Sequence, residues 1–156
     1  MPIDNPMGTI HLERIIAAPP ADVFDVVTSS ENLRFAPVVL RVKRVREGRE
    51  GGWSAGSVRE VVAAGAWFRE EITVIDPPHT FEYRILRSIP PITHFGGTIR
   101  VSPVAEGSHV VWRTTFDIPR VAGGKVSAVL AERILAPSFT RILAEAERRL
   151  TSAARR

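Results

Sequence analysis

The sequence predicts one α+β domain in which a curved antiparallel sheet wraps around a long C-terminal helix. Three observations support this fold class. The chain has 156 residues, of which 44% are hydrophobic and 24% charged, and both figures are typical of one globular domain. Hydrophobic residues recur with a period close to two over residues 38–117, and with a helical period from Gly124 to about Thr151. We therefore expect residues 1–156 to form a single domain, with residues 1–7 as a flexible tail.

A strand and two short helices are expected ahead of the main strand region. Residues 9–16 alternate apolar and polar side chains, and the prolines that follow end this strand because proline cannot donate to a strand ladder. A helix then begins at Pro20. Its apolar side chains share one face: Val23, Phe24 and Val27. A second short helix is expected from Ser30 to Phe35, closed by Pro37.

Residues 38–117 are expected to form six further strands, which brings the predicted sheet to seven. Glycine and proline mark the turns: Gly48, Gly51, Gly52, Gly65, Pro77, Pro78, Pro90, Pro91 and Gly107. The helical segment after Gly124 carries one apolar stripe: Leu135, Phe139, Leu143, Ala146 and Leu150. Pro137 lies inside this segment, and we expect it to kink the helix.

The turn positions also predict which residues face each other across the strands. A two-residue loop at residues 64–65 sets Arg59 opposite Glu70 and Val61 opposite Phe68. The hairpin around residues 76–79 gives three more pairs: Val74 with Phe81, Ile72 with Tyr83, and Glu70 with Ile85. A bulge loop at Gly107 gives two more: Val101 with Val110, and Ile99 with Trp112. The predicted result is a concave apolar face that the C-terminal helix must cover.

Composition excludes several classes of protein. With no cysteine, the chain has no disulfide framework, thiolate nucleophile or sulfur metal ligand. No apolar run reaches the roughly 18 to 20 residues that span a bilayer, so we expect a cytoplasmic protein without stable membrane insertion. The net charge is +4, but the basic residues are scattered along the chain, so we expect no nucleic-acid partner. Phosphate-loop, dinucleotide and serine-hydrolase fingerprints are missing, and no cofactor is expected.

Several segments carry a resemblance to a known superfamily: residues 17–28, 56–59, 70–78, 81–83 and 107–112. In these segments the chain resembles the START-like or SRPBCC superfamily, and within it the polyketide cyclase/dehydrase branch. The resemblance covers nearly the whole chain. It implies a helix-grip fold, with two short helices between the first two strands. It also implies a ligand-binding domain whose cavity lies between sheet and long helix, with a mouth near the short helices and the strand loops.

The predicted buried face and the helix stripe supply the candidate ligand-binding residues: Arg59, Phe68, Glu70, Ile72, Tyr83, Ile85, Trp112 and Phe139. Arg59 and Glu70 are expected to pair, because an unpaired buried charge is costly. The pair either binds a ligand carbonyl or carboxylate or is purely structural. Tyr83 either orients an enol or phenol or only packs.

The histidines do not indicate a metal site, because they lie far apart in the sequence: His11, His79, His94 and His109. His94 is a candidate acid/base residue, since an imidazole titrates near neutral pH. It lies beside Gly96 and Gly97, where the strand pattern is ambiguous, and we expect it at the surface or in a loop.

Three functions remain open. The first is binding or carriage of a hydrophobic small molecule, lipid-like or polyketide-like. The second is a polyketide cyclase/dehydrase that uses Arg59, Glu70, Tyr83 or His94 to steer enolisation or loss of water. The third is a partner-binding module that uses the basic residues 41–46 or the basic C-terminal tail. The sequence assigns no catalytic residues and leaves a homodimer open.

Overall fold

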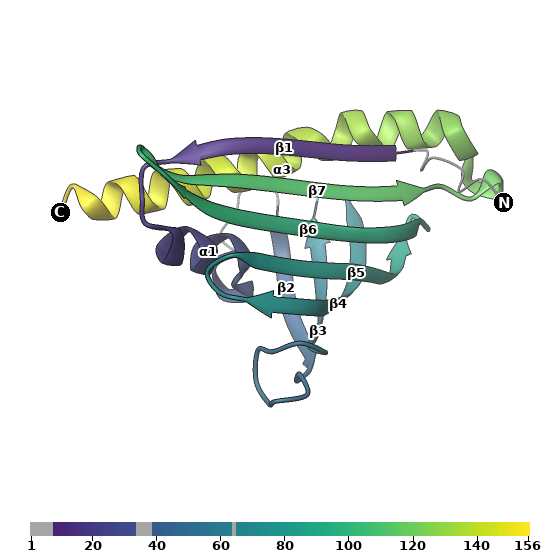
Figure 1. Cartoon of the computed structure of the whole chain (residues 1–156). Helices are drawn as coiled ribbons and strands as arrows, with labels where there is room; N and C mark the ends of the chain where they lie inside the picture. Colours follow the sequence, from purple (N-terminus) through teal and green to yellow (C-terminus); the bar gives the residue numbers. More distant parts are fainter. Residues whose placement is uncertain (1–7, 34–38, 64) are drawn as a thin grey trace, which may run out of the picture.

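The computed structural model describes residues 8–33, 39–63 and 65–156. Within these residues, seven antiparallel strands form a curved sheet with a long C-terminal helix against it (Figure 1). The elements in chain order are β1 (Gly8–Ile16), α1 (Pro20–Thr28), α2 (Ser30–Leu33), β2 (Val39–Arg46), β3 (Val58–Ala63), β4 (Ala66–Asp76), β5 (Thr80–Ile89), β6 (Thr93–Val104), β7 (Gly107–Asp117), the 3₁₀ turn η1 (Arg120–Ala122) and α3 (Gly124–Ala154). The predicted α+β class and helix-grip arrangement are confirmed. The predicted tail at residues 1–7, and the end of the second helix at Phe35 and Pro37, lie outside the described residues.

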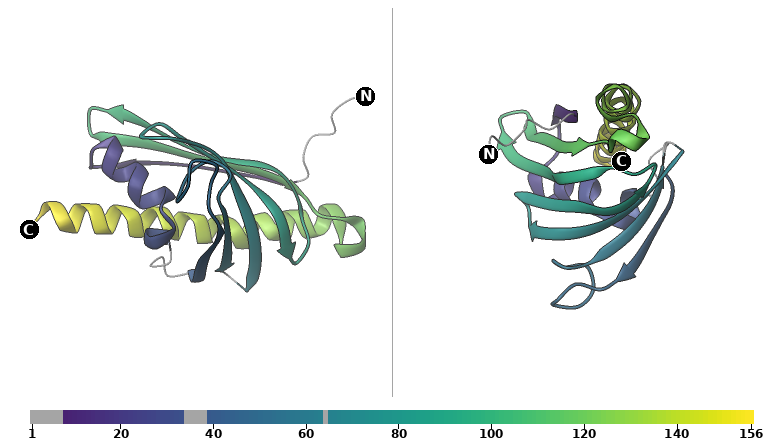
Figure 2. Two further views of the ribbon diagram at one scale, coloured as in Figure 1. Left: turned by 90° about the horizontal axis from the view of Figure 1, so that it is seen from below. Right: turned by 90° about the vertical axis from the view of Figure 1, so that its right-hand side faces the viewer.

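The sheet order is β1-β7-β6-β5-β4-β3-β2, so the first strand of the chain lies beside the last. β1 pairs with β7 from Gly8 opposite Phe116 to Ile16 opposite Ser108. α3 runs along β1 and β7, while the strands from β5 to β2 curl around beneath it (Figure 2). The curl turns the inward side chains of β3, β4 and β5 toward the helix.

The predicted strand register is confirmed in two hairpins and partly wrong in the third. Arg59 lies opposite Glu70 and Val61 opposite Phe68, and Ile99 lies opposite Trp112. In the β4–β5 hairpin, Ile72 pairs with Tyr83 and Glu70 with Ile85, as expected. Val74, however, pairs with Glu82, and Ile75 takes the place opposite Phe81. A bulge between Ile72 and Val74 adds one residue to β4, and an added residue moves the following side chains to the other face.

The short helix α1 anchors one end of the sheet. Pro20 is its first residue, as predicted. The three apolar residues predicted to share one face are buried in the main core: Val23, Phe24 and Val27. Each fully buried apolar side chain of this size stabilises the fold by roughly 1.5–3 kcal/mol. α2 follows at once, and this tight connection brings the Thr28 carbonyl and the Ser30 hydroxyl close to Arg59 of β3.

The long helix α3 packs on two clusters of the core. Its first half covers Ile10, Phe116 and Ile118, and its second half buries Ile142, Leu143 and Ala146 in the main core. The rest of the predicted stripe is partly buried: Leu135, Phe139 and Leu150. The helix continues through Pro137, and the predicted kink there stays a prediction.

Candidate functional site

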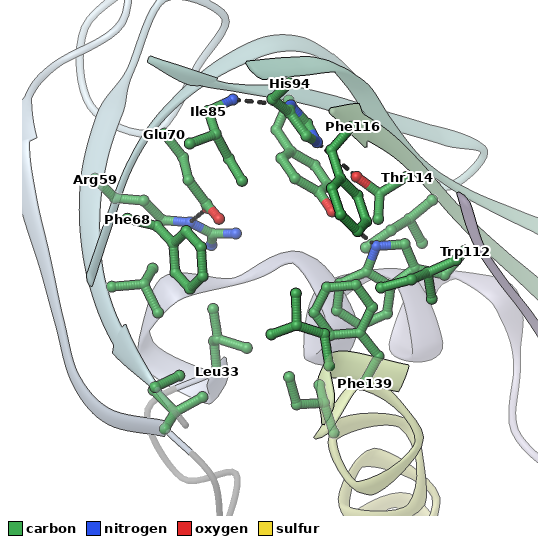
Figure 3. A pocket seen from close by; sticks show the side chains of 18 of the residues that line it. Leu33, Arg59, Phe68, Glu70, Ile85, His94, Trp112, Thr114, Phe116 and Phe139 are labelled. Carbon is green, nitrogen blue, oxygen red and sulfur yellow. Dashed lines mark hydrogen bonds and ion pairs between the residues drawn. The ribbon is translucent and has the colours of Figure 1, made fainter. Parts of the chain in front are cut away.

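An interior cavity lies between the concave face of the sheet and α3 (Figure 3). It offers about 80 Å³ to the centres of water-sized molecules. Its lining is mainly apolar and comes from both sides. The sheet supplies residues such as Val61, Ile85 and Ile99, and α3 supplies Leu135, Phe139 and Ile142. Val27 of α1 and Leu33 of α2 also line the cavity, and the side chains leave the space between sheet and helix unfilled.

Most of the predicted ligand-binding residues line this cavity: Arg59, Phe68, Glu70, Tyr83, Ile85, Trp112 and Phe139. Ile72 does not. It is completely buried within the main core cluster. The rings of Trp112 on β7 and Phe139 on α3 stack with centroids 4.3 Å apart, so they join sheet and helix at the edge of the cavity.

Arg59 and Glu70 form an ion pair on the inner face of the sheet. Arg59 Nε donates to Glu70 Oε2 at 2.8 Å, and the two side chains are only 7% and 11% exposed. The guanidinium carbon also lies 5.5 Å from the ring centre of Trp53 and 5.8 Å from that of Phe81. Arg59 Nη1 makes two long hydrogen bonds, to Thr28 O at 3.5 Å and to Ser30 Oγ at 3.4 Å. These contacts hold the guanidinium in one place.

The Arg59–Glu70 pair does not use all of its hydrogen-bonding positions. Among the described residues, neither Arg59 Nη2 nor Glu70 Oε1 has a hydrogen-bond partner. Both residues line the cavity, and Figure 3 shows the pair at its edge. The pair therefore offers one free donor nitrogen and one free acceptor oxygen to whatever occupies the space.

Tyr83 adds a second polar group to the wall. Its hydroxyl oxygen accepts a hydrogen bond from Trp112 Nε1 at 3.0 Å. Burial, together with the nearby negative charge of Glu70, raises the pKa of Tyr83 to about 12. The hydroxyl therefore keeps its proton at neutral pH and is suited to donate a hydrogen bond rather than to act as a base.

The prediction that His94 lies at the surface or in a loop is wrong. His94 belongs to β6, is 8% exposed and lines the cavity. A bulge between His94 and Gly96 explains this position, since it leaves Phe95 outside the pairing and 57% exposed while His94 points inward.

Both ring nitrogens of His94 are engaged. The backbone N–H of Ile85 donates to Nδ1 at 3.0 Å, so the proton resides on Nε2, which lies 2.5 Å from Thr114 Oγ1. Burial lowers the pKa of His94 to about 4, and the imidazole is neutral at pH 7. Its ring stacks on Tyr83 with centroids 5.6 Å apart. His94 therefore holds Tyr83 and Thr114 in place and has no free nitrogen for proton transfer.

The sequence analysis missed several other lining residues. Thr114 and Phe116 follow Trp112 at intervals of two on β7, so strand alternation could have identified both. Ile92 lies in the connection between β5 and β6, where no periodicity applies.

A second, outer groove is lined in part by the start of α3 and by the connection from β5 to β6. Figure 1 shows these elements at the end of the molecule away from α1. The groove offers about 300 Å³ and is also bordered by the β3–β4 turn. Three residues line both this groove and the interior cavity: Phe68, Ile92 and Leu135. These side chains therefore form the partition between the two spaces.

Over the ranges 8–33, 39–63 and 65–156, no group of three or more His, Asp or Glu side chains could hold a metal ion. In the same ranges, no helix is long and apolar enough to cross a membrane.

Comparison with known proteins gives a family match over most of the chain. The model of the family described as polyketide cyclase / dehydrase and lipid transport matches residues 7–151. No curated protein sequence matches the chain.

Solved structures share the fold at low sequence identity. TTHA0849 from Thermus thermophilus superposes with a TM-score of 0.74 at 22% identity, over 93% of this chain and 98% of its own. A START superfamily protein from Mycobacterium smegmatis gives 0.71 at 10% identity, over 93% and 98%. DynU16, encoded in the dynemicin biosynthetic locus, gives 0.65 at 13% identity, over 93% of this chain and 48% of its own. At these identities the likeness establishes the fold alone.

Proposed function

This chain belongs to the family of polyketide cyclases/dehydrases and lipid transport proteins, and we propose that it binds and carries a lipid-like or polyketide-like molecule in the cavity beneath α3. The family and its START-like structural neighbours support hydrophobic-ligand binding in general. One observation carries the finer proposal: an apolar interior space has a few inward polar atoms, on Arg59, Glu70 and Tyr83. Small-molecule sites usually combine these two features.

The size of the space supports a ligand rather than a packing defect. Protein interiors are close-packed and contain few voids larger than one water molecule. The cavity offers several times the roughly 10–15 Å³ that one water centre needs, and it shares three lining residues with the outer groove. A ligand that displaces Phe68, Ile92 or Leu135 would gain the volume of both.

Carriage also fits the state of the polar groups, because it requires no proton transfer. Both nitrogens of His94 are used, and Tyr83 keeps its proton at neutral pH. A partner-binding module has less support, since side chains leave the cavity unfilled. A homodimer stays a prediction.

A cyclase or dehydrase is the second candidate, and the free oxygen of Glu70 favours it. Oε1 could take a proton from the carbon beside a ligand carbonyl, while Arg59 Nη2 and the Tyr83 hydroxyl stabilise the enolate oxygen. Deuterium exchange at that carbon of a bound β-diketone measures this step. Because a β-diketone also exchanges in buffer alone, the informative quantity is the rate above that background. Acceleration that is lost in Glu70→Gln supports an enzyme, and binding without acceleration supports a carrier.

Binding of Nile red, a neutral fluorescent dye, tests the leading proposal. We expect saturable binding at about one dye per chain, with displacement by a monoacylglycerol. Ala63→Phe, which fills the cavity, should abolish binding. Val62→Phe, on the other face of the same strand, is the matched control and should bind dye normally. Absence of saturable binding to the folded wild-type protein would mean that the proposal is wrong.

A further inference from the structure

We propose that the cavity selects uncharged ligands that carry a hydroxyl or keto oxygen, and that it rejects ligands with a free carboxylate. This inference rests on the proposed function, because it names the chemical class of ligand for the same cavity. It follows from the charge balance of the Arg59–Glu70 pair and from the absence of a second cation among the described residues of the lining.

The charge of Arg59 is already neutralised within the wall. Its Nε lies 2.8 Å from Glu70 Oε2, and both side chains are almost completely buried. A ligand carboxylate near Arg59 would therefore also meet the carboxylate of Glu70. A buried anion needs a cation of its own to offset lost hydration, and here the cation is shared.

A hydroxyl group suits the same two atoms. It can accept a hydrogen bond from Arg59 Nη2 and donate one to Glu70 Oε1, which are the two positions without partners among the described residues. A keto oxygen can use the donor alone. Both are uncharged and lose less hydration than a carboxylate when they enter an apolar space.

The remaining titratable groups of the wall supply no positive charge at neutral pH. Burial lowers the pKa of His94 to about 4, which keeps the ring neutral. Tyr83 is protonated, because burial raises its pKa to about 12, and it lines the same cavity as the ion pair. A ring system with two oxygens could reach the ion pair with one and Tyr83 with the other.

Two probes with the same apolar ring system compare an uncharged ligand with a carboxylate: 2-naphthol, which is neutral at pH 7, and 2-naphthoate, which is an anion. Displacement of Nile red from the full chain at pH 7 gives both affinities. We expect 2-naphthol to bind at least about tenfold more tightly, as expected for one well-placed hydrogen bond to a charged group. Equal affinities, or tighter binding of 2-naphthoate, would overturn the inference.

Glu70→Gln tests whether the negative charge of Glu70 causes the rejection of carboxylates. The change keeps the side-chain shape and leaves Arg59 as an uncompensated cation. We expect the affinity for 2-naphthoate to rise by about tenfold or more while that for 2-naphthol does not rise. The matched control is Glu60→Gln, which makes the same change in the Glu60–Arg69 pair on the outer face of the same two strands. A change of preference in both variants, or in neither, would contradict the proposal.

A second variant keeps the test decisive if Glu70→Gln does not fold. Arg59→Met with Glu70→Leu replaces the pair by apolar side chains of similar size, which proteins often tolerate. It should bind 2-methylnaphthalene as tightly as 2-naphthol and still reject 2-naphthoate; a retained preference for 2-naphthol would overturn the inference. If Nile red and both naphthalene probes fail to bind the wild-type protein, the proposed function itself is wrong. If they bind without the predicted preference, only the ligand class is wrong.

Discussion

The indole N–H of Trp112 on β7 donates to the hydroxyl of Tyr83 on β5 at 3.0 Å, although β6 lies between these strands. Gly97 of β6 makes the bond possible. It pairs with Tyr83 on one side and Thr114 on the other, and a Cβ at this position would overlap the Tyr83 ring. One missing side chain therefore lets two side chains from non-adjacent strands meet above the sheet.

Gly97→Ala should displace the Tyr83 ring. We expect a loss of roughly 1–3 kcal/mol in the free energy of unfolding, because added atoms in a packed site force neighbours to shift. Urea denaturation measures it, and the Nile red titration should show weaker binding. In a Tyr83→Ala background the same Gly97→Ala change should cost almost nothing. An equal cost in both backgrounds would mean that the overlap with Tyr83 is not the cause.

Tyr83→Phe should leave the Trp112 indole N–H buried without its partner. The expected loss is about 1–3 kcal/mol in the free energy of unfolding, the usual cost of an unsatisfied buried donor. Urea denaturation of Tyr83→Phe, Trp112→Phe and the double variant gives the coupling between the two residues. If the single effects simply add, the hydrogen bond contributes nothing to stability.

Glu70→Gln should reduce stability much more than Glu60→Gln. Removal of Glu70 strands Arg59 at a buried site, which costs roughly 3–5 kcal/mol, whereas a partly exposed pair contributes about 0–1 kcal/mol. Urea denaturation at pH 7 compares the two variants with the wild type. Similar losses of stability in both variants would contradict the structure, because they would mean that the Arg59–Glu70 pair is not desolvated.

His94 should make stability depend on pH. Its pKa is about 4 in the folded protein and 6.5 ordinarily, so between these values the unfolded chain binds a proton that the folded protein does not. The contribution is fully present above pH 6.5 and is lost as the pH falls from 6.5 to 4, by about 3.5 kcal/mol at about 1.4 kcal/mol per pKa unit. Urea denaturation at pH 7 and pH 5 should show a smaller drop for His94→Gln than for the wild type. The same drop in both proteins would exclude His94 as its source.

Leu135→Ala should speed ligand exchange, because Leu135 lies in the partition between the cavity and the outer groove. We expect faster association and faster dissociation of Nile red in stopped-flow measurements, with a smaller change in Kd. Ile134→Ala is the matched control, since this neighbour lines the outer groove and not the cavity. Unchanged rates in Leu135→Ala would mean that ligands reach the cavity by another route.

The sequence by itself determined the hairpins and the side chains that face inward along their regular parts. Strand alternation and the loop at residues 64–65 were sufficient to set Arg59 opposite Glu70, and the helical period identified the stripe of α3 that packs on the core. These features are local: a turn type and a side-chain period fix them, whatever the rest of the chain does.

The tertiary structure alone decided the direction of His94, the pairing beyond Ile72 and the presence of an unfilled cavity. The two bulges each insert one residue without a distinctive local signal, and every side chain after a bulge changes face. The cavity depends on how far the curled strands stand from α3, which is set by contacts between residues distant in sequence, such as Trp112 with Phe139. Local periodicity identifies the side chains that face inward, but only packing between sheet and helix determines whether those side chains touch or leave space between them.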